Sequence, residues 1–135
     1  MRDIDRIIIH CTATPRGRAV TVEEVRRWHV KGNKWSDIGY HYLVDIHGEI
    51  NHGRPLGKIG AHCYGNNQTT IGVVYVGGTD KQGLPEDTMT KEQEAGIHKL
   101  IEALRIILPK RVTIHGHNEY SRKSCPSFIV KDRFK

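Results

Sequence analysis

Long hydrophobic runs are missing from this 135-residue chain: no apolar stretch approaches the roughly 18 residues that a membrane-spanning helix needs. The first six residues alternate charges where a signal peptide would have an uninterrupted apolar segment. Repeats, linkers and low-complexity segments are also missing, and the length suits one domain covering residues 1–135. We therefore expect a single domain that is made in the cytoplasm without a signal peptide and does not insert into a membrane.

Cysteine is scarce and widely spaced, and the three residues are Cys11, Cys63 and Cys125. Their odd count and wide spacing exclude a disulfide scaffold, and the lack of any Cys-x-x-Cys pair excludes a zinc ribbon. Histidine, by contrast, is unusually frequent, with nine residues that include the widely separated His10, His62 and His117. A catalytic metal site is typically gathered from separate elements in this way, whereas a structural zinc finger is not.

Dense basic runs with interleaved aromatic residues are not found, and neither is a phosphate-cradling loop. The net charge is nevertheless +6, from 21 basic and 15 acidic residues. A positive balance favours an anionic partner: nucleic acid, an anionic cell envelope or an acidic ligand. Because nucleic acid has the least support among these, we expect no nucleic-acid partner.

Apolar periodicity predicts strands and helices in the order β-α-β-β-β-α-β. Capping boxes mark both helix starts, Thr21 with Glu24 and Thr90 with Gln93. The expected strands cover residues 6–10, 40–46, 49–52, 70–76 and 111–114, and the expected helices cover 21–30 and 90–108. The run 70–76 is the most strand-like and should be central in the sheet. These elements imply an α/β (α+β) single domain, with a mixed sheet of about five strands covered by about three helices.

Polar residues suited to binding zinc follow the last expected strand. Within eleven residues the chain places His115, His117, Glu119, Lys123 and Cys125. Imidazole and thiolate are side chains that zinc prefers, and an α/β fold places its chemistry at strand ends. His10 also ends an expected strand, so His10, Cys125 and a histidine of this segment can supply the three ligands of a catalytic zinc. The spacing does not choose between His115 and His117.

Two further polar residues could take part in hydrolysis. Lys123 offers a positive charge near Cys125 that could stabilise an oxyanion. Tyr40 directly follows Gly39 at a strand entrance, and its hydroxyl is either buried and hydrogen-bonded or a catalytic donor; the residues alone favour the structural role. Strand alternation predicts that Tyr40 shares a face with Tyr42 and Val44.

Other residues have simpler expected roles. Cys11 should point away from His10, on the opposite face of the first strand, and should not bind the same metal. The Gly- and Asn-rich segment 60–67 should be a surface loop that carries His62 as a candidate ligand-contacting residue. Trp28 and Trp35 are expected to be packing residues.

Four segments of the chain resemble the type 2 N-acetylmuramoyl-L-alanine amidases, which include phage lysozyme-amidases and animal peptidoglycan recognition proteins. They are residues 7–14 (IIIHCTAT), 37–44 (DIGYHYLV), 60–73 (GAHCYGNNQTTIGV) and 117–128 (HNEYSRKSCPSF). The segments occur in the order and spacing of the family and cover about residues 5–130. A lysine at the position of Lys123 is typical of the phage members, whereas many others carry threonine.

The resemblance implies a zinc enzyme that hydrolyses the amide between N-acetylmuramic acid and L-alanine in bacterial peptidoglycan. It implies that Zn²⁺ is held by His10, His117 and Cys125, and it thereby selects His117 over His115. It also places Glu119 at an acidic position of the family, where a brace beside the ligand is favoured over a catalytic base.

The family also assigns roles to four residues that do not bind the metal. The resemblance implies that Tyr40 and Lys123 assist catalysis and that His62 and Asn67 line the substrate groove. Peptidoglycan and its muropeptides are then the expected partners. We expect a monomer that reaches the cell wall after release, as a phage or prophage-type lysin does.

Two alternative functions come with the resemblance. The first is a peptidoglycan-binding protein without turnover; such members typically lack the cysteine ligand, which this chain retains as Cys125. The second is a phage lysin that also inhibits a phage RNA polymerase, a role of particular members that no feature of this sequence encodes.

Overall fold

The centre of the molecule is a five-stranded sheet in a computed structural model that describes residues 2–135. Its strand order is β4-β3-β5-β1-β7, with β5 in the middle as predicted. Strands β3, β5, β1 and β7 run parallel to one another, and β4 pairs antiparallel with β3 in a hairpin. These strands cover Arg6–Cys11 (β1), Tyr42–Val44 (β3), Ile50–His52 (β4), Thr70–Tyr75 (β5) and Thr113–Gly116 (β7).

The remaining elements are two α-helices and several short segments. Helix α1 (Val22–Arg27) continues directly into a π-helical turn (Trp28–Gly32), and helix α2 covers Lys91–Ile107. Two-residue strands β2 (Thr14–Pro15) and β6 (Gly78–Thr79) form a second small sheet that the sequence analysis did not predict. Single turns of 3₁₀ helix occur at His117–Glu119 and Val130–Asp132. Within residues 2–135, no helix combines the length and apolar content needed to cross a membrane.

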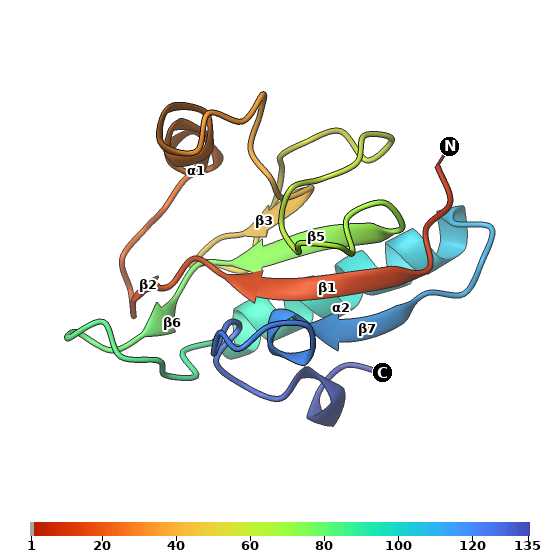
Figure 1. Ribbon diagram of the computed structural model, residues 1–135. Helices are drawn as coiled ribbons and strands as arrows, with labels where there is room; N and C mark the ends of the chain where they lie inside the picture. The colour runs from red at the N-terminus through yellow and green to blue at the C-terminus, as the bar shows by residue number, and fades with distance from the viewer. Residues whose placement is uncertain (1) are drawn as a thin grey trace.

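Helix α2 covers one face of the sheet, behind β1 and β5 in Figure 1. It begins at the predicted capping box: the Thr90 hydroxyl accepts from the Gln93 N–H, and the Gln93 side chain accepts from the Thr90 N–H. Its apolar stripe packs against alternate residues of the sheet, including Ile7 and Ile9 of β1. Because side chains alternate along a strand, Ile8 and His10 point to the other face.

Helix α1 contributes to a smaller core on that other face. Val25 of α1 packs with Leu43 of β3 and Val74 of β5. This second cluster lies toward β3 and leaves the face of β1 free for polar groups, among them His10. The sheet therefore separates a purely structural face, under α2, from a face that can carry chemistry.

Tyr40 does not share the face of Tyr42 and Val44, so that prediction is wrong. Tyr42 and Val44 belong to the core under α2, whereas Tyr40 packs with the cluster on the other face, which contains Leu43. The reason is that β3 begins at Tyr42, so the alternation of a strand does not extend back to Tyr40.

The segment 60–67 is also not a simple surface loop. His62 and Cys63 are buried, and the Asn67 side-chain oxygen accepts hydrogen bonds from both of their backbone N–H groups, over 3.0 and 2.9 Å. A side chain that satisfies backbone donors allows a Gly-rich loop to fold inward. The sequence pattern indicated an irregular segment correctly but not its burial.

Gly96 should be intolerant of alanine although it lies inside helix α2. A β-carbon there would lie 2.3 Å from the carbonyl oxygen of Gly48, in the β3–β4 turn. Alanine usually stabilises a helix interior by about 1 kcal/mol relative to glycine. Here we expect Gly96→Ala to destabilise the fold by about 1–3 kcal/mol, because two backbones must separate. Urea unfolding measures the difference.

Gly57→Ala is the matched control, because a β-carbon at Gly57 meets no atom within 4 Å. This variant should unfold at the wild-type urea concentration or slightly above it. A Gly96→Ala protein as stable as Gly57→Ala would show that α2 can move away from the turn at no cost.

Candidate metal centre

Three potential metal ligands converge at the strand ends, on the face of the sheet that is opposite α2. One ligand atom each from His10, His117 and Cys125 lies within 4.8 Å of the others. The structure therefore brings together the three residues that the sequence resemblance selected. They could hold one metal ion.

The sheet register explains why residues so distant in sequence meet. Strand β1 pairs in parallel with β7, with Ile9 opposite Gly116, so the next residues of the two strands, His10 and His117, leave the sheet side by side. Their ring centroids are 4.6 Å apart. Cys125 returns to the same strand ends after a short loop, where its sulfur accepts a hydrogen bond from the Cys11 N–H over 3.1 Å.

The donor set fits zinc. Burial lowers the pKa of His10 well below its ordinary value, and burial followed by the charge of Lys123 lowers the pKa of His117. Both rings are therefore neutral at pH 7, which is the form that binds a metal. The contact with the Cys11 side chain, followed by burial, raises the pKa of the Cys125 thiol, so its thiolate forms when a metal displaces the proton. The Cys11 N–H then donates to the sulfur that carries the charge. Within residues 2–135, the cluster contains no fourth potential ligand. Two neutral imidazoles and one cysteine that binds as a thiolate are the ligand number and type of a catalytic zinc site.

His115 is excluded from this cluster by its own contacts. Its Nδ1 lies 2.9 Å from Glu119 and its Nε2 lies 2.7 Å from the Thr113 hydroxyl. Glu119 also accepts from the Gly116 N–H over 2.7 Å. Glu119 therefore braces the end of β7, and His115 is a strand residue.

Tyr40 lies beside the candidate metal ligands. Its ring centroid is 5.0 Å from that of His10, and burial raises the pKa of the phenol, so the hydroxyl keeps its proton at neutral pH. Within residues 2–135, no protein group hydrogen-bonds this hydroxyl. It is therefore available to donate to a ligand. Lys123 is exposed and lines the same cleft, and its charge lowers the pKa of both candidate histidine ligands.

Tyr40, His117 and Lys123 line a cleft of about 720 Å³. The predicted groove residues His62 and Asn67 border it, but both use polar atoms inside the protein. Both ring nitrogens of His62 lie near protein groups, and the oxygen of Asn67 accepts from backbone N–H groups. Across residues 2–135, the Asn67 side chain bonds protein groups through its oxygen alone, so its amide nitrogen is available to a ligand.

Two aromatic residues at the cleft were not expected there from the sequence, Trp35 and His29. Trp35 was expected to be a packing residue, yet it is 37% exposed and lines the cleft; Trp28 is likewise 39% exposed. His29 lines the same wall, with its ring 4.7 Å from that of Trp35 and 5.4 Å from that of Tyr40. Its Nδ1 accepts from the Gly39 N–H over 2.8 Å, which leaves Nε2–H to face the cleft. The sequence did offer one indication of this cleft wall, because His29 is a polar residue on the apolar stripe of the first helix.

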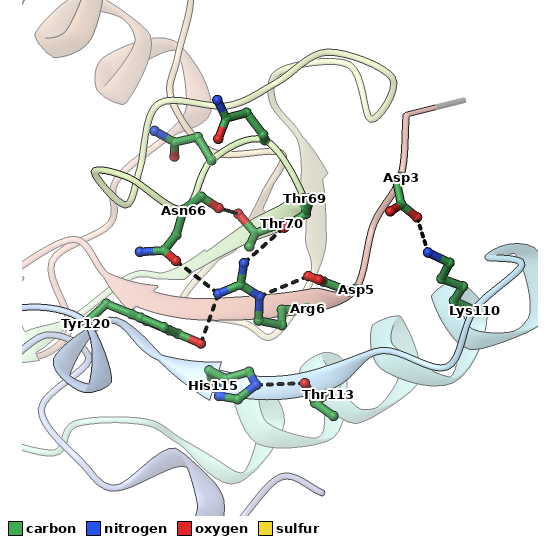
Figure 2. A network of polar contacts seen from close by, with 12 residues as sticks. Asp3, Asp5, Arg6, Asn66, Thr69, Thr70, Lys110, Thr113, His115 and Tyr120 are labelled. Carbon is green, nitrogen blue, oxygen red and sulfur yellow. Dashed lines mark hydrogen bonds and ion pairs between the residues drawn. The ribbon is translucent and has the colours of Figure 1, made fainter.

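Arg6 connects the opposite walls of the cleft. Figure 2 shows its guanidinium between Asn66 and Thr69, which precede β5, and Tyr120, which follows β7. The three hydrogen bonds measure 3.0, 2.9 and 3.2 Å respectively. Because Tyr120 lines the cleft, Arg6 fixes the spacing between the loop that carries His62 and the loop that carries Lys123.

A family model for N-acetylmuramoyl-L-alanine amidases matches residues 1–128. The chain belongs to this family. Among the relatives of this amidase-family chain, the endolysin of Enterobacteria phage K11 is 37% identical over 130 residues, which cover 96% of this chain and 85% of that protein. The resemblance inferred from four sequence segments is thus confirmed over nearly the whole chain.

Solved structures confirm the fold expected for an amidase-family member. N-acetylmuramoyl-L-alanine amidase LysC from Clostridium intestinale has a TM-score of 0.77 at 24% identity, covering 93% of this chain and 77% of that one. A substituted Drosophila PGRP-LB in complex with tracheal cytotoxin has a TM-score of 0.80 at 21% identity, covering 100% and 85%. At these identities the likeness concerns the α+β architecture with its mixed five-stranded sheet.

Proposed function

We propose that this chain is a zinc-dependent N-acetylmuramoyl-L-alanine amidase. It hydrolyses the amide that joins the lactyl group of N-acetylmuramic acid to L-alanine of the stem peptide. The observation that carries the proposal is the convergence of His10, His117 and Cys125 within 4.8 Å, beside Tyr40 and a large cleft. Membership of the amidase family supports the choice of bond.

The roles of the residues follow from their chemistry. Zinc held by His10, His117 and Cys125 would supply a Lewis acid that polarises the carbonyl and makes water a better nucleophile at neutral pH. Tyr40 donates its phenolic proton as a hydrogen bond to the carbonyl oxygen while that oxygen gains negative charge. Lys123, which lines the same cleft, adds a positive charge.

The cleft and the overall charge suit this substrate. Three aromatic side chains line the cleft: Trp35, Tyr64 and Tyr120. Their flat apolar surfaces suit sugar rings or stem-peptide side chains. The net charge of +6 suits an anionic wall and the carboxylates of the stem peptide. The similarity to a phage endolysin supports a lysin that acts on the cell wall after release.

The test is a digestion of purified muropeptides with the zinc-loaded protein. Hydrolysis of the proposed bond should release stem peptides with a free L-alanine amine and leave an intact glycan with a lactyl carboxylate. Mass spectrometry identifies the fragments, and amine labelling quantifies the new termini. Chelation of zinc should stop the release, and added zinc should restore it.

Other digestion products would contradict the proposal. New reducing sugar ends without free alanine amines would identify a glycosidase. Binding of muropeptide without any released peptide, with zinc present, would identify a peptidoglycan receptor.

A further inference from the structure

His62 contacts the candidate metal ligand His10 inside the protein. Its Nδ1 lies 2.8 Å from His10 Nε2, and the two rings meet edge to face with centroids 4.9 Å apart. His10 is 1% exposed and His62 is 9% exposed, so water does not compete for this contact. The proposed mechanism gives His62 no task, and its ring nitrogens are engaged by protein atoms.

The Thr70 hydroxyl, which lies at the other nitrogen of His62, shows which histidine donates in this hydrogen bond. The Thr70 hydroxyl lies 2.7 Å from the carbonyl oxygen of Asn66, which can accept but cannot donate (Figure 2). The hydroxyl has one proton and gives it to that oxygen, so toward His62 Nε2, 3.3 Å away, it can act only as an acceptor. His62 therefore carries its proton on Nε2 and has a lone pair on Nδ1.

The tautomer of His10 follows from that of His62. Because His62 Nδ1 is an acceptor, the proton of the short contact belongs to His10 Nε2. A neutral imidazole holds one proton, so His10 Nδ1 is left with its lone pair. That nitrogen is the one that can bind a metal.

The surrounding backbone is shaped to hold the His62 ring. A β-carbon at Gly72 on β5 would lie 2.6 Å from His62 Cγ, and one at Gly60 would lie 2.9 Å from His62 Cδ2. Glycine inside a strand weakens the strand, and it often marks a place where another group approaches closely. Asn67 holds the backbone of His62 through the 3.0 Å bond that it accepts from the His62 N–H. The His62 ring thus occupies space that a β-carbon at either glycine would fill.

We propose that His62 is a positioning residue for the metal site: it holds His10 as the Nε2–H tautomer and presents the Nδ1 lone pair of His10 to the metal. Thr70 sets the direction of this series of hydrogen bonds, because its hydroxyl accepts from His62 Nε2–H. This inference rests on the proposed zinc site for its function, although the tautomer itself is a property of the metal-free protein. A hydrogen bond to the second nitrogen of a metal-binding histidine commonly fixes its tautomer and strengthens binding.

The first test needs neither zinc nor activity. Two-bond ¹H–¹⁵N correlation spectra of the metal-free protein at pH 7 report which nitrogen of each histidine is protonated, and a His10→Gln spectrum assigns the His10 signals. We expect the Nε2–H form for His10 in the wild type. His62→Leu, which removes the acceptor, should give a mixture of both forms. Protonation of His10 on Nδ1 in the wild type would overturn the proposal.

The second test measures zinc affinity by competition with a chelator. His62→Leu should bind zinc about 10–100-fold more weakly than the wild type. His62→Asn should restore most of the affinity, because the asparagine oxygen can accept near the position of Nδ1. Thr70→Val should weaken binding in the same direction as His62→Leu, because His62 then loses the group that fixes its own proton. The exposed His47→Leu is the control and should change neither readout.

The comparison between variants separates positioning from packing. Equal weakening in His62→Asn and His62→Leu would show that the ring shape matters and not the acceptor, and would overturn the proposal. So would wild-type affinity in a folded His62→Leu or Thr70→Val protein. A wild-type protein that binds no zinc would refute the proposed function, while the spectra of the metal-free protein would still decide the tautomer.

Discussion

Cys125→Ser is expected to abolish amidase activity and zinc retention together. Serine preserves the size of the side chain but replaces a thiolate ligand with a hydroxyl that stays protonated at neutral pH. Removing the metal removes several kcal/mol of transition-state stabilisation, which corresponds to a loss of at least about 10³-fold in rate. Muropeptide digestion and elemental analysis of dialysed protein measure the two quantities in one preparation.

His115→Gln is the matched control for the ligand set. His115 lies close to His117 in sequence, but its ring faces Glu119 and Thr113, outside the metal cluster. It should retain zinc and activity, whereas His117→Gln should lose both. Full activity of Cys125→Ser with stoichiometric zinc would remove Cys125 from the ligand set.

Tyr40→Phe should separate metal binding from catalysis. The substitution keeps the ring that packs beside His10 and removes the hydroxyl that can donate to a developing oxyanion. Loss of one such donor costs about 10²–10³-fold in kcat. Zinc content should change little, because Tyr40 is not one of the three candidate ligands. KM should also change little, because a hydrogen bond that strengthens only as the oxygen gains charge raises kcat and not substrate binding. Steady-state kinetics on a defined muropeptide measure the effect.

Tyr42→Phe serves as the control two residues further along. Tyr42 points to the opposite face of the sheet, into the core under α2, so its hydroxyl cannot reach the cleft. Its kcat should stay at the wild-type value. A Tyr40→Phe enzyme with unchanged kcat would leave Lys123 as the remaining candidate for stabilising the oxyanion.

Elements that depend on local sequence were predicted well. The start of α2 follows from the mutual hydrogen bonds of Thr90 and Gln93, which lie within one helical turn and need no tertiary contact. The central place of β5 follows from its β-branched, apolar composition, which suits a strand buried on both faces. Local chemistry is sufficient in both cases because the information lies within one turn or one strand.

Features that depend on distant contacts were not accessible in the same way. The inward fold of the segment 60–67 requires Asn67 to bind the backbone of His62, and it requires Gly72 on a strand to leave space for the His62 ring. The exposure of Trp35 depends on the direction of the chain between the π-helical turn and β3. Neither property has a local signature in composition or period.

The candidate metal site lies between these two cases. Residue chemistry pointed to His10, Cys125 and a nearby histidine, but spacing alone left His115 and His117 equivalent. The family resemblance chose His117, and the sheet register gives the physical reason: the residue after Gly116 leaves β7 beside His10. Metal binding itself remains a prediction that the zinc analysis of the Cys125 variant tests.

The position of β1 between β5 and β7 has a consequence for the order of events during synthesis. The ribosome makes β1 early, yet both of its neighbouring strands come much later in the chain. Until they emerge, the apolar run Ile7–Ile9 has no partner and is a target for chaperones or for aggregation. His10 lies on that strand and Cys125 follows it by more than a hundred residues, so the candidate metal site can form only after Cys125 has been synthesised. A nascent chain that stops short of Cys125 therefore lacks one of the three candidate metal ligands.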